Sequence, residues 1–388
     1  MNVTVRPELI AWARNRASLT VAELAPKVGT KTKPAPIQDW EDSETPVEIP
    51  VKQLEKFAEK TRAPFGMLFL SEPPVERLPI RDFRRPTTDG SRQPSLNLLE
   101  TIYDYQIKQS WLSSAFQDEG DEPLSFVGSA SIRDSVTALA ADIRARLRIG
   151  TEERQAVRTS GDSVLWLIGR LAESRINVIR KSYFRTNTKS SLDPMEFKGF
   201  ALADQYAPFI FINGKDWPAS QIFTIAHECV HLWLGESALP SGEWFVEAVD
   251  PVERFCNQVA AEILIPAAEL ERSWRTADSV QANAVRIGRE FRVSSLASLY
   301  RARNTNIITE SELQSVRSQL QADFERRPET KKGSGGDPYN NKGIELGKDF
   351  IRRVVARTLE GRTLYSEAFE LLGTKNTDVV HTLAQRFL

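Results

Sequence analysis

Apolar positions follow a helical period over most of the chain and form strand-like runs only in its middle. Residues 1–72 contain short stretches of helical spacing separated by glycine and prolines, which predicts a compact bundle of short helices. Three apolar runs then predict a small three-stranded sheet, at residues 176–179, 199–203 and 208–213. Helical spacing returns after the third run. The fold class is therefore expected to be α+β and mainly helical.

Two stretches without apolar periodicity divide the chain. Ser71–Pro94 is rich in proline and arginine and predicts a surface linker, whereas 326–343 is charged and rich in glycine and asparagine and predicts a flexible linker. Six parts follow: a helix-turn-helix-like domain (1–72), a linker and helical segment (73–130), a central domain (131–275), a helical extension (276–325), the flexible linker (326–343) and a C-terminal helical module (344–388).

Composition narrows the classes of protein to which the chain can belong. A length of 388 residues predicts two or three domains, and a net charge of −1 provides no bulk positive field to attract nucleic acid. No apolar run is long enough to span a bilayer, and the first residues lack the apolar core of a signal peptide. Two cysteines form no disulfide framework. We therefore expect a cytoplasmic protein with no membrane partner.

Two of the three histidines lie four residues apart, in the segment His227-Glu228-Cys229-Val230-His231. Positions i and i+4 share one face of a helix, so both imidazoles can bind one zinc ion while Glu228 reaches a water molecule on that ion. Pro218 and Gly235 mark where this helix should begin and end. The alternative interpretation is a structural histidine pair on an amphipathic helix.

A hydrolytic zinc site needs a third protein ligand besides His227 and His231. The remaining histidine, His381, lies beyond the predicted flexible linker, so a carboxylate is expected. Glu253 is the best candidate, because it follows the second histidine by 253 − 231 = 22 residues on the next predicted helix. In the alternative interpretation Glu253 caps its own helix, and Glu247 is then the fallback ligand.

The neighbours of Glu253 on its helix are predicted from the helical period. Cys256 and Asn257 follow it by three and four positions, so both are expected beside the site, whereas Glu262 falls on the opposite face. Cys256 is interpreted as a small buried packing residue, and an oxidant-sensing thiol is the alternative. Cys229 is expected to point away from the metal and into the core.

The motif and the helix after it resemble two segments of the ImmA/IrrE family of metallopeptidases. Ile222–Leu232 looks like the FTLAHELGHL segment of that family, and Glu253–Pro266 resembles its ExxAN-x-FAAxLLMP helix. The resemblance implies a zincin-like peptidase core for the central domain, 131–275. It also implies the zinc ligands, with the catalytic base named last: His227, His231, Glu253 and Glu228.

Family members with this layout carry an N-terminal helix-turn-helix, and residues 1–72 resemble an XRE-like domain of that kind. The segment that should read DNA, Thr30–Trp40, contains Pro34 and Pro36, which should shorten its helix. Residues 30–48 carry two lysines against five acidic residues, 2 − 5 = −3, and such a face repels phosphate. DNA binding is thus weakly supported, and partner docking or dimerisation is the other expectation.

The leading hypothesis is a cytoplasmic, regulatory zinc metallo-endopeptidase in which Glu228 moves the proton of the attacking water. Three polar residues are weak candidates for an oxyanion donor, each also consistent with a surface or packing role: Tyr183, Tyr206 and Arg254. The resemblance alone implies a repressor-like or antitoxin-like protein substrate, and hence a place in stress response or toxin–antitoxin regulation. The alternative is a non-proteolytic transcriptional regulator or antitoxin that binds DNA or a partner.

The C-terminal module contains a basic helix. Residues 342–362 carry six basic and three acidic side chains, 6 − 3 = +3. Nucleic acid or an acidic partner is one expectation for this helix, and a solvated face is the other. Turns are expected at Gly361 and Gly373, and residues 280–304 are expected to form a second helix-turn-helix-like pair.

Overall fold

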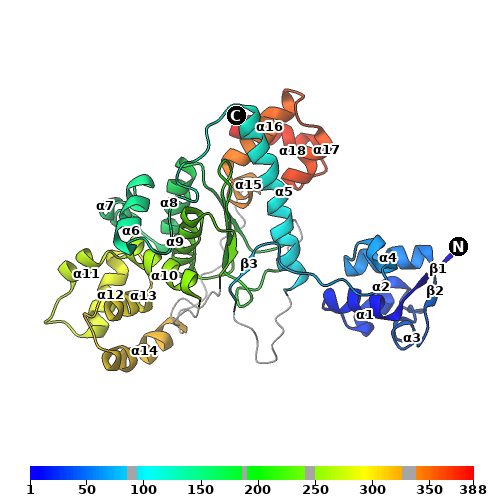
Figure 1. Cartoon of the computed structure of the whole chain (residues 1–388), viewed down its shortest axis with the longest axis horizontal. Helices are drawn as coiled ribbons and strands as arrows, with labels where there is room; N and C mark the ends of the chain where they lie inside the picture. Colours follow the sequence, from blue (N-terminus) through cyan, green and yellow to red (C-terminus); the bar gives the residue numbers. More distant parts are fainter. Residues whose placement is uncertain (85–93, 186–189, 241–249, 326–337) are drawn as a thin grey trace. The chain divides into compact units, whose positions relative to one another are not determined.

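The structure, a computed structural model, describes residues 1–84, 94–185, 190–240, 250–325 and 338–388 (Figure 1). Contacts between residues divide the chain into two compact units. The first unit comprises residues 1–79 and 87–100, and the second comprises residues 80–86 and 101–388. The linker predicted between them therefore contributes residues to both units.

The first unit is a small helical bundle with a two-stranded antiparallel sheet. Its elements are β1 (Asn2–Val5), α1 (Pro7–Arg16), α2 (Val21–Val28), α3 (Ile37–Glu41), β2 (Val47–Pro50), α4 (Val51–Thr61) and the 3₁₀ helix η1 (Phe65–Phe69). The core contains fully buried Leu9, Leu24 and Phe57. The helices confirm the predicted bundle, but β1 and β2 were not predicted, because four residues are too few to reveal a period of two.

Helix α3, in the segment expected to read DNA, has five residues. Pro34 and Pro36 directly precede it, which confirms that the prolines shorten this helix. Trp40 at its end is 7% exposed and packs edge-on against Phe57, with ring centroids 6.4 Å apart. The principal aromatic side chain of the segment therefore faces inward.

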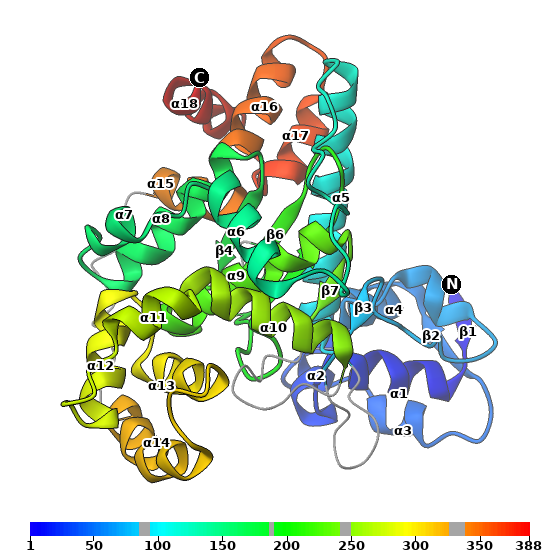
Figure 2. The ribbon, with the colours of Figure 1, turned by 60° about the vertical axis from the view of Figure 1, so that its left-hand side comes forward.

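The second unit contains a mixed sheet (Figure 2). Its strand order is β3-β7-β5-β6-β4. The strands are β3 (Arg81–Asp82), β4 (Asn177–Lys181), β5 (Gly199–Leu202), β6 (Phe209–Asn213) and β7 (Ala238–Leu239). The three predicted strands are confirmed, but the predicted total of three is wrong. Two-residue strands carry no periodic signal, and β3 lies inside the stretch that we predicted to be a surface linker.

The helices of this part of the chain range from five residues in α7 to 23 residues in α5. They are α5 (Leu96–Asp118), α6 (Val136–Arg146), α7 (Thr151–Gln155), α8 (Ser160–Glu173), α9 (Pro218–Leu234), α10 (Pro251–Leu264), α11 (Ala267–Ser273), α12 (Val280–Glu290), α13 (Ser295–Asn304), α14 (Glu310–Glu325), α15 (Pro338–Leu346), α16 (Lys348–Leu359), α17 (Tyr365–Leu372) and α18 (Thr377–Phe387). The pair α12–α13 and the terminal module confirm the helices expected there. No helix among the described residues is long and apolar enough to cross a bilayer.

Helices cover both faces of the sheet, and strand β6 shows why. All five of its residues are buried. Ile210 and Ile212 belong to the core that includes α9, whereas the ring of Phe211 lies 5.2 Å from that of Tyr105 on α5. Side chains alternate between faces along a strand, so a continuous apolar run indicates burial on both sides.

The end of the predicted flexible linker is helical. Residues 326–337 lie outside the described residues, but α15 begins at Pro338, so the predicted boundary at 343 is wrong. The Lys342 Nζ atom donates a hydrogen bond to the Leu372 carbonyl oxygen at 2.8 Å. This anchor could not be inferred from composition, because Gly, Pro and Asn dominate the preceding stretch.

The basic helix α16 has an acidic partner within the chain. Arg357 pairs with Asp118, with Nη2 and Oδ2 2.8 Å apart, and Arg353 pairs with Glu119 and Asp121. These acidic residues lie at and just beyond the C-terminal end of α5. Part of the +3 charge of the segment therefore serves to dock the C-terminal module.

Candidate metal centre

Helices α9 and α10 pack against each other and carry the predicted site (Figures 1 and 2). Helix α9 starts at Pro218 and ends at Gly235, which adopts a left-handed conformation with φ of 71°. Helix α10 is capped by Asp250, whose Oδ1 atom accepts a hydrogen bond from the Val252 N–H at 2.8 Å. Both ends of α9 confirm the prediction. Asp250 caps α10 while Glu253 faces α9.

Three ligand-type atoms form a compact triangle between these helices. The Nε2 atoms of His227 and His231 are 3.1 Å apart. Glu253 Oε1 lies 3.1 Å from His231 Nε2 and 3.4 Å from His227 Nε2. Bonds of 2.0–2.2 Å at tetrahedral angles separate ligand atoms by about 3.3–3.6 Å. The triangle therefore has nearly the size of one face of a tetrahedral zinc site.

Glu228 lies beside this triangle and is fully buried. Neither of its carboxylate oxygens has a hydrogen-bond partner among the described residues. Burial raises the pKa of Glu228 well above its ordinary value, and the charge of Glu253 raises it further. Buried polar groups are almost always satisfied, so an unpartnered carboxyl group indicates a place for a bound ion or water.

The protonation states suit cation binding. Burial lowers the pKa of His231, which keeps its imidazole neutral at pH 7. Burial opposes the ionisation of Glu253, but the nearby histidines outweigh it and hold the pKa of this carboxyl group well below its ordinary range. A neutral imidazole at His231 and an ionised carboxylate at Glu253 are the forms of these two groups that bind a metal ion.

A second layer of side chains contacts the histidines. The Oδ1 atom of Asn257 lies 3.0 Å from His227 Nδ1, and the Cys256 Sγ atom lies 3.8 Å from His231 Nδ1. Both neighbours stand where the helical period of α10 places them. Phe83 stacks against the ring of His231, with centroids 5.9 Å apart and an interplanar angle of 23°. No pattern in the sequence indicated Phe83, because it lies in a proline- and arginine-rich stretch.

Phe83 is held in place by strand β3. Its N–H donates to the Leu239 carbonyl oxygen at 2.9 Å, and Arg81 lies 3.3 Å from the carboxylate of Asp250, the cap of α10. Arg84 is 7% exposed and pairs with Asp82 at 2.8 Å. The prediction of a surface linker is wrong for residues 81–84, because Arg81 and Arg84 are paired with carboxylates and the backbone joins the sheet.

The three predicted oxyanion candidates have other surroundings. The Tyr183 hydroxyl donates to Glu345 Oε1 at 2.5 Å, so it is engaged by α15 and not by the histidines. Tyr206 lies in the turn between β5 and β6, where its N–H donates to Asp204 at 2.9 Å. Arg254 is exposed on α10. The sequence pattern that predicts strands and turns does not indicate which residues these side chains contact.

The remaining acidic and histidine candidates are separated from the triangle. Glu262 pairs with Arg301 on the other face of α10, as its period predicts. His381 packs near Tyr365 in the terminal module, with ring centroids 6.3 Å apart. Cys229 is buried in the core, as expected. Glu247 lies outside the described residues.

Comparison with known families supports the interpretation of this region. Residues 176–303 match the Peptidase_M78 family, described as the IrrE N-terminal-like domain. The match runs from β4 to α13 and includes the whole triangle. It supports the ImmA/IrrE resemblance for this segment and suggests a hydrolase of metallopeptidase type. His227, His231 and Cys256 also form a group that could hold a metal ion, with ligand atoms within 4.8 Å of one another.

A second match lies in the C-terminal module. Residues 346–386 match a family described as a domain of unknown function (DUF8813). Neither match includes residues 1–72. No curated protein matches the chain.

Proposed function

We propose that this protein is a cytoplasmic zinc-dependent endopeptidase that cleaves a specific protein partner. The main support is the triangle of His227, His231 and Glu253 beside the unpartnered carboxyl group of Glu228. The Peptidase_M78 match over the same helices is an independent support. A structural histidine pair would not explain why the buried carboxylate of Glu253 faces both imidazole rings. It would also not explain why the buried carboxyl group of Glu228 has no hydrogen-bond partner among the described residues.

The proposed zinc ligands are His227 Nε2, His231 Nε2 and Glu253 Oε1. Cys256 is the rival third ligand, but its sulfur lies near Nδ1 of His231, whereas Glu253 lies near Nε2 of both rings. The two nitrogens of one imidazole point in different directions, so a single ion contacts only one of them. The geometry thus favours Glu253. Asn257 is assigned to orienting the ring of His227, whereas Cys256 makes only a long contact with His231 Nδ1, at 3.8 Å.

Zinc bound there would polarise the scissile carbonyl group and acidify the attacking water. Glu228 would accept a proton from the attacking water and pass it to the leaving amine. Its buried position supports this role, since burial raises the pKa of the carboxyl group above its ordinary value and makes the carboxylate a stronger proton acceptor. Asn257 fixes the tautomer of His227 by occupying its Nδ1 position.

The test combines metal content with one isosteric variant. Purified protein should contain one zinc per chain, and Glu228→Gln should keep that zinc while losing roughly 10²–10⁴-fold in cleavage rate. Absence of stoichiometric zinc would overturn the site. Full cleavage by a zinc-loaded Glu228→Gln protein would overturn the role of the glutamate.

The substrate can be found by comparing the wild type with the same variant. The product of the neighbouring gene should be incubated with wild-type protein and with Glu228→Gln, and new N-termini should be mapped by mass spectrometry. A repressor-like or antitoxin-like protein cleaved at one site only by the wild type is the expected result. The same comparison in whole cells extends the search to other partners.

We propose that the first unit docks a protein partner. Its helix α3 has five residues, and the segment 30–48 has a charge of 2 − 5 = −3. A short, acidic element is poorly suited to the phosphate contacts that supply most DNA affinity. A gel-shift assay with the promoter of its own gene should therefore show no complex at physiological salt, and a retarded band would instead favour the transcriptional regulator.

A further inference from the structure

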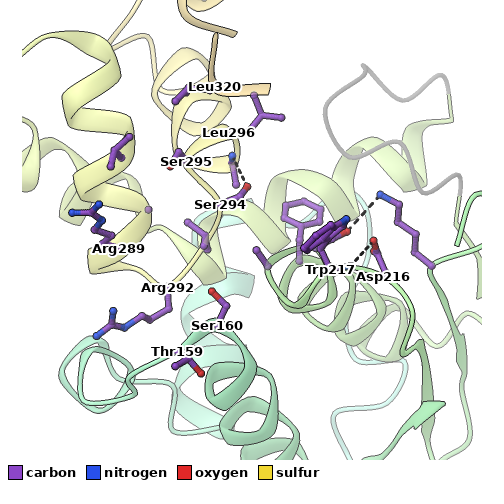
Figure 3. A pocket seen from close by; sticks show the side chains of 18 of the residues that line it. Thr159, Ser160, Asp216, Trp217, Arg289, Arg292, Ser294, Ser295, Leu296 and Leu320 are labelled. Carbon is purple, nitrogen blue, oxygen red and sulfur yellow. Dashed lines mark hydrogen bonds between the residues drawn. The ribbon is translucent and has the colours of Figure 1, made fainter. Parts of the chain in front are cut away.

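A cavity of about 490 Å³ lies away from the triangle, between the N-terminal ends of α8 and α9 and the helix pair α12–α13 (Figure 3). No residue of the histidine cluster lines it. Apolar side chains form most of its inner wall: Trp217, Phe223, Val285, Val293, Leu296 and Leu320. Its size is within the range of sites that enclose small organic molecules.

The charged residues around this cavity are mainly basic. Arg158, Lys198, Arg289 and Arg292 line it together with Asp216, so their sum is 4 − 1 = +3. The whole chain has a net charge of −1, so this local excess of positive charge does not follow from its composition. Arg158 and Arg289 are exposed although they line the cavity, which places their charges at its opening. In Figure 3 Arg289 and Arg292 lie across from Trp217.

The N-terminal end of helix α13 adds to the same field. This helix begins at Ser295, which lines the cavity, and it carries no acidic residue in its first turn, whereas α8 carries Asp162 there. The first amides of a helix have no intrahelical acceptor and carry partial positive charge. With the basic side chains at the opening, they favour a negatively charged group over a neutral or cationic one.

We propose that this cavity binds a small organic anion with a flat apolar body, such as an aromatic carboxylate or sulfonate. The apolar body would lie between Trp217, Phe223 and Leu296, and the anionic group would lie toward Arg158 and Arg289. A large hydrophobic molecule without charge would leave the basic opening uncompensated. An inorganic anion alone would leave the apolar wall in contact with water.

The cavity touches the helix that carries the histidines. Phe223 lines it and precedes His227 by 227 − 223 = 4 residues, so the two lie on one face of α9, about 6 Å apart along the axis. The bound molecule therefore contacts α9 one turn before the triangle. Binding itself does not depend on zinc or on peptidase activity, so it can be tested separately.

A matched pair of fluorescent probes separates the apolar and the anionic contributions. 8-Anilinonaphthalene-1-sulfonate carries a sulfonate, and N-phenyl-1-naphthylamine has the same rings without it. The folded full-length protein should bind one sulfonate probe per chain, several-fold more tightly than the neutral probe. Added salt should weaken only the sulfonate probe.

Variants then locate the binding. The double substitution Arg158→Gln with Arg289→Gln should weaken the sulfonate probe roughly three- to tenfold and leave the neutral probe unchanged. Arg148→Gln, an exposed arginine outside the cavity, is the control and should change neither probe. Ala219→Trp, which fills the cavity, should weaken both probes, and Ala297→Leu does the same with a smaller change in volume.

The probe measurements test separately whether the site prefers an anion and whether the cavity is the site. Equal binding of the two probes, or no effect of the double arginine variant, would overturn the anionic part of the proposal. Unchanged binding of both probes to folded Ala219→Trp and Ala297→Leu proteins would overturn the cavity as the site. If a His227→Ala protein binds the sulfonate probe with wild-type affinity, probe binding is independent of the proposed peptidase.

Discussion

Helix α10 carries two buried glutamates with different partners. Glu253 and Glu262 are nine positions apart, and at about 100° per residue nine positions amount to half a turn beyond two full turns, so they lie on opposite faces. Glu262 pairs with Arg301, whose pKa falls to about 10 through burial and which therefore stays charged at pH 7. Glu253 faces two histidines, and one of them is kept neutral by burial.

The contrast shows how to separate structural from functional buried charge. A carboxylate with a permanent cation beside it has its charge compensated within the fold, and the Arg301 Nε atom is further bound to the Ile265 carbonyl oxygen at 2.8 Å. Glu253 instead lies beside two imidazoles, which are not permanent cations and whose Nε2 atoms can also bind a metal ion. Such a carboxylate is stabilised fully only when a cation is added.

The largest expected effect comes from replacing each of the two glutamates by glutamine in a separate variant. Zinc binding of about 10–16 kcal/mol over four ligands corresponds to roughly 3 kcal/mol per ligand, so Glu253→Gln should weaken zinc at least about 10²-fold. Glu262→Gln should keep zinc but lower the free energy of unfolding by about 3–5 kcal/mol, because Arg301 loses its counter-ion. Competition with a chelator and urea unfolding measure the two quantities. Equal loss of zinc in both variants would contradict the contrast.

The next effect concerns the amide beside His227. Asn257→Ala should lower zinc affinity about 10- to 100-fold, because the ring loses the partner of its Nδ1 atom. Gln258→Ala is the matched control, since Gln258 is the next residue and is exposed. If both variants bind zinc as the wild type does, the amide has no orienting role.

A smaller effect should appear in metal-free protein as pH changes. The pKa of Glu228 is raised by burial, so its stabilising contribution is complete below its ordinary value of 4.5 and is lost as pH rises. Glu228→Gln should therefore gain about 1–3 kcal/mol over metal-free wild type at pH 8 and little at pH 4. The pKa of Glu253 is lowered, so Glu253→Gln should be less stable than wild type at pH 8 and approach it in acid. Urea unfolding at pH 4 and pH 8 gives the difference in free energy of unfolding between each variant and wild type. If this difference changes with pH in the same direction for both variants, the prediction is wrong.

The smallest expected effect is that of Cys256. Cys256→Ala should change zinc affinity by less than about threefold, because the sulfur lies near Nδ1 rather than Nε2 of His231. Cobalt-substituted wild-type protein should likewise lack a sulfur-to-metal charge-transfer band. An intense band that disappears in Cys256→Ala would make this cysteine the third ligand and remove the contrast between the two glutamates.

Local signals in the sequence were sufficient for α9, α10 and the four main residues of the centre. The i, i+4 spacing of the histidines and the period that places Asn257 near Glu253 act within a few turns of helix, where neighbouring positions follow from the 3.6-residue repeat. These features are confirmed as placements of side chains. Their roles as ligands and base stay predictions.

Long-range contacts were not accessible in the same way. Phe83 reaches His231, and Tyr183 reaches Glu345, across separations of more than 140 residues. Nothing in the composition of a proline- and arginine-rich stretch distinguishes an exposed linker from an edge strand whose charges are paired. The two-residue strands β3 and β7 are too short for any periodic pattern, and only the sheet that they extend gives them a position.

Strand β3 sets an order of events during synthesis. Asp82 pairs with Leu239, so its partner leaves the ribosome 239 − 82 = 157 residues later. At roughly 5–20 residues per second this delay is about 8–30 s, during which residues 1–79 can fold while the segment after them has no strand to join. A protein fragment that starts after residue 84 would lack this strand and the ring stacked on His231 altogether.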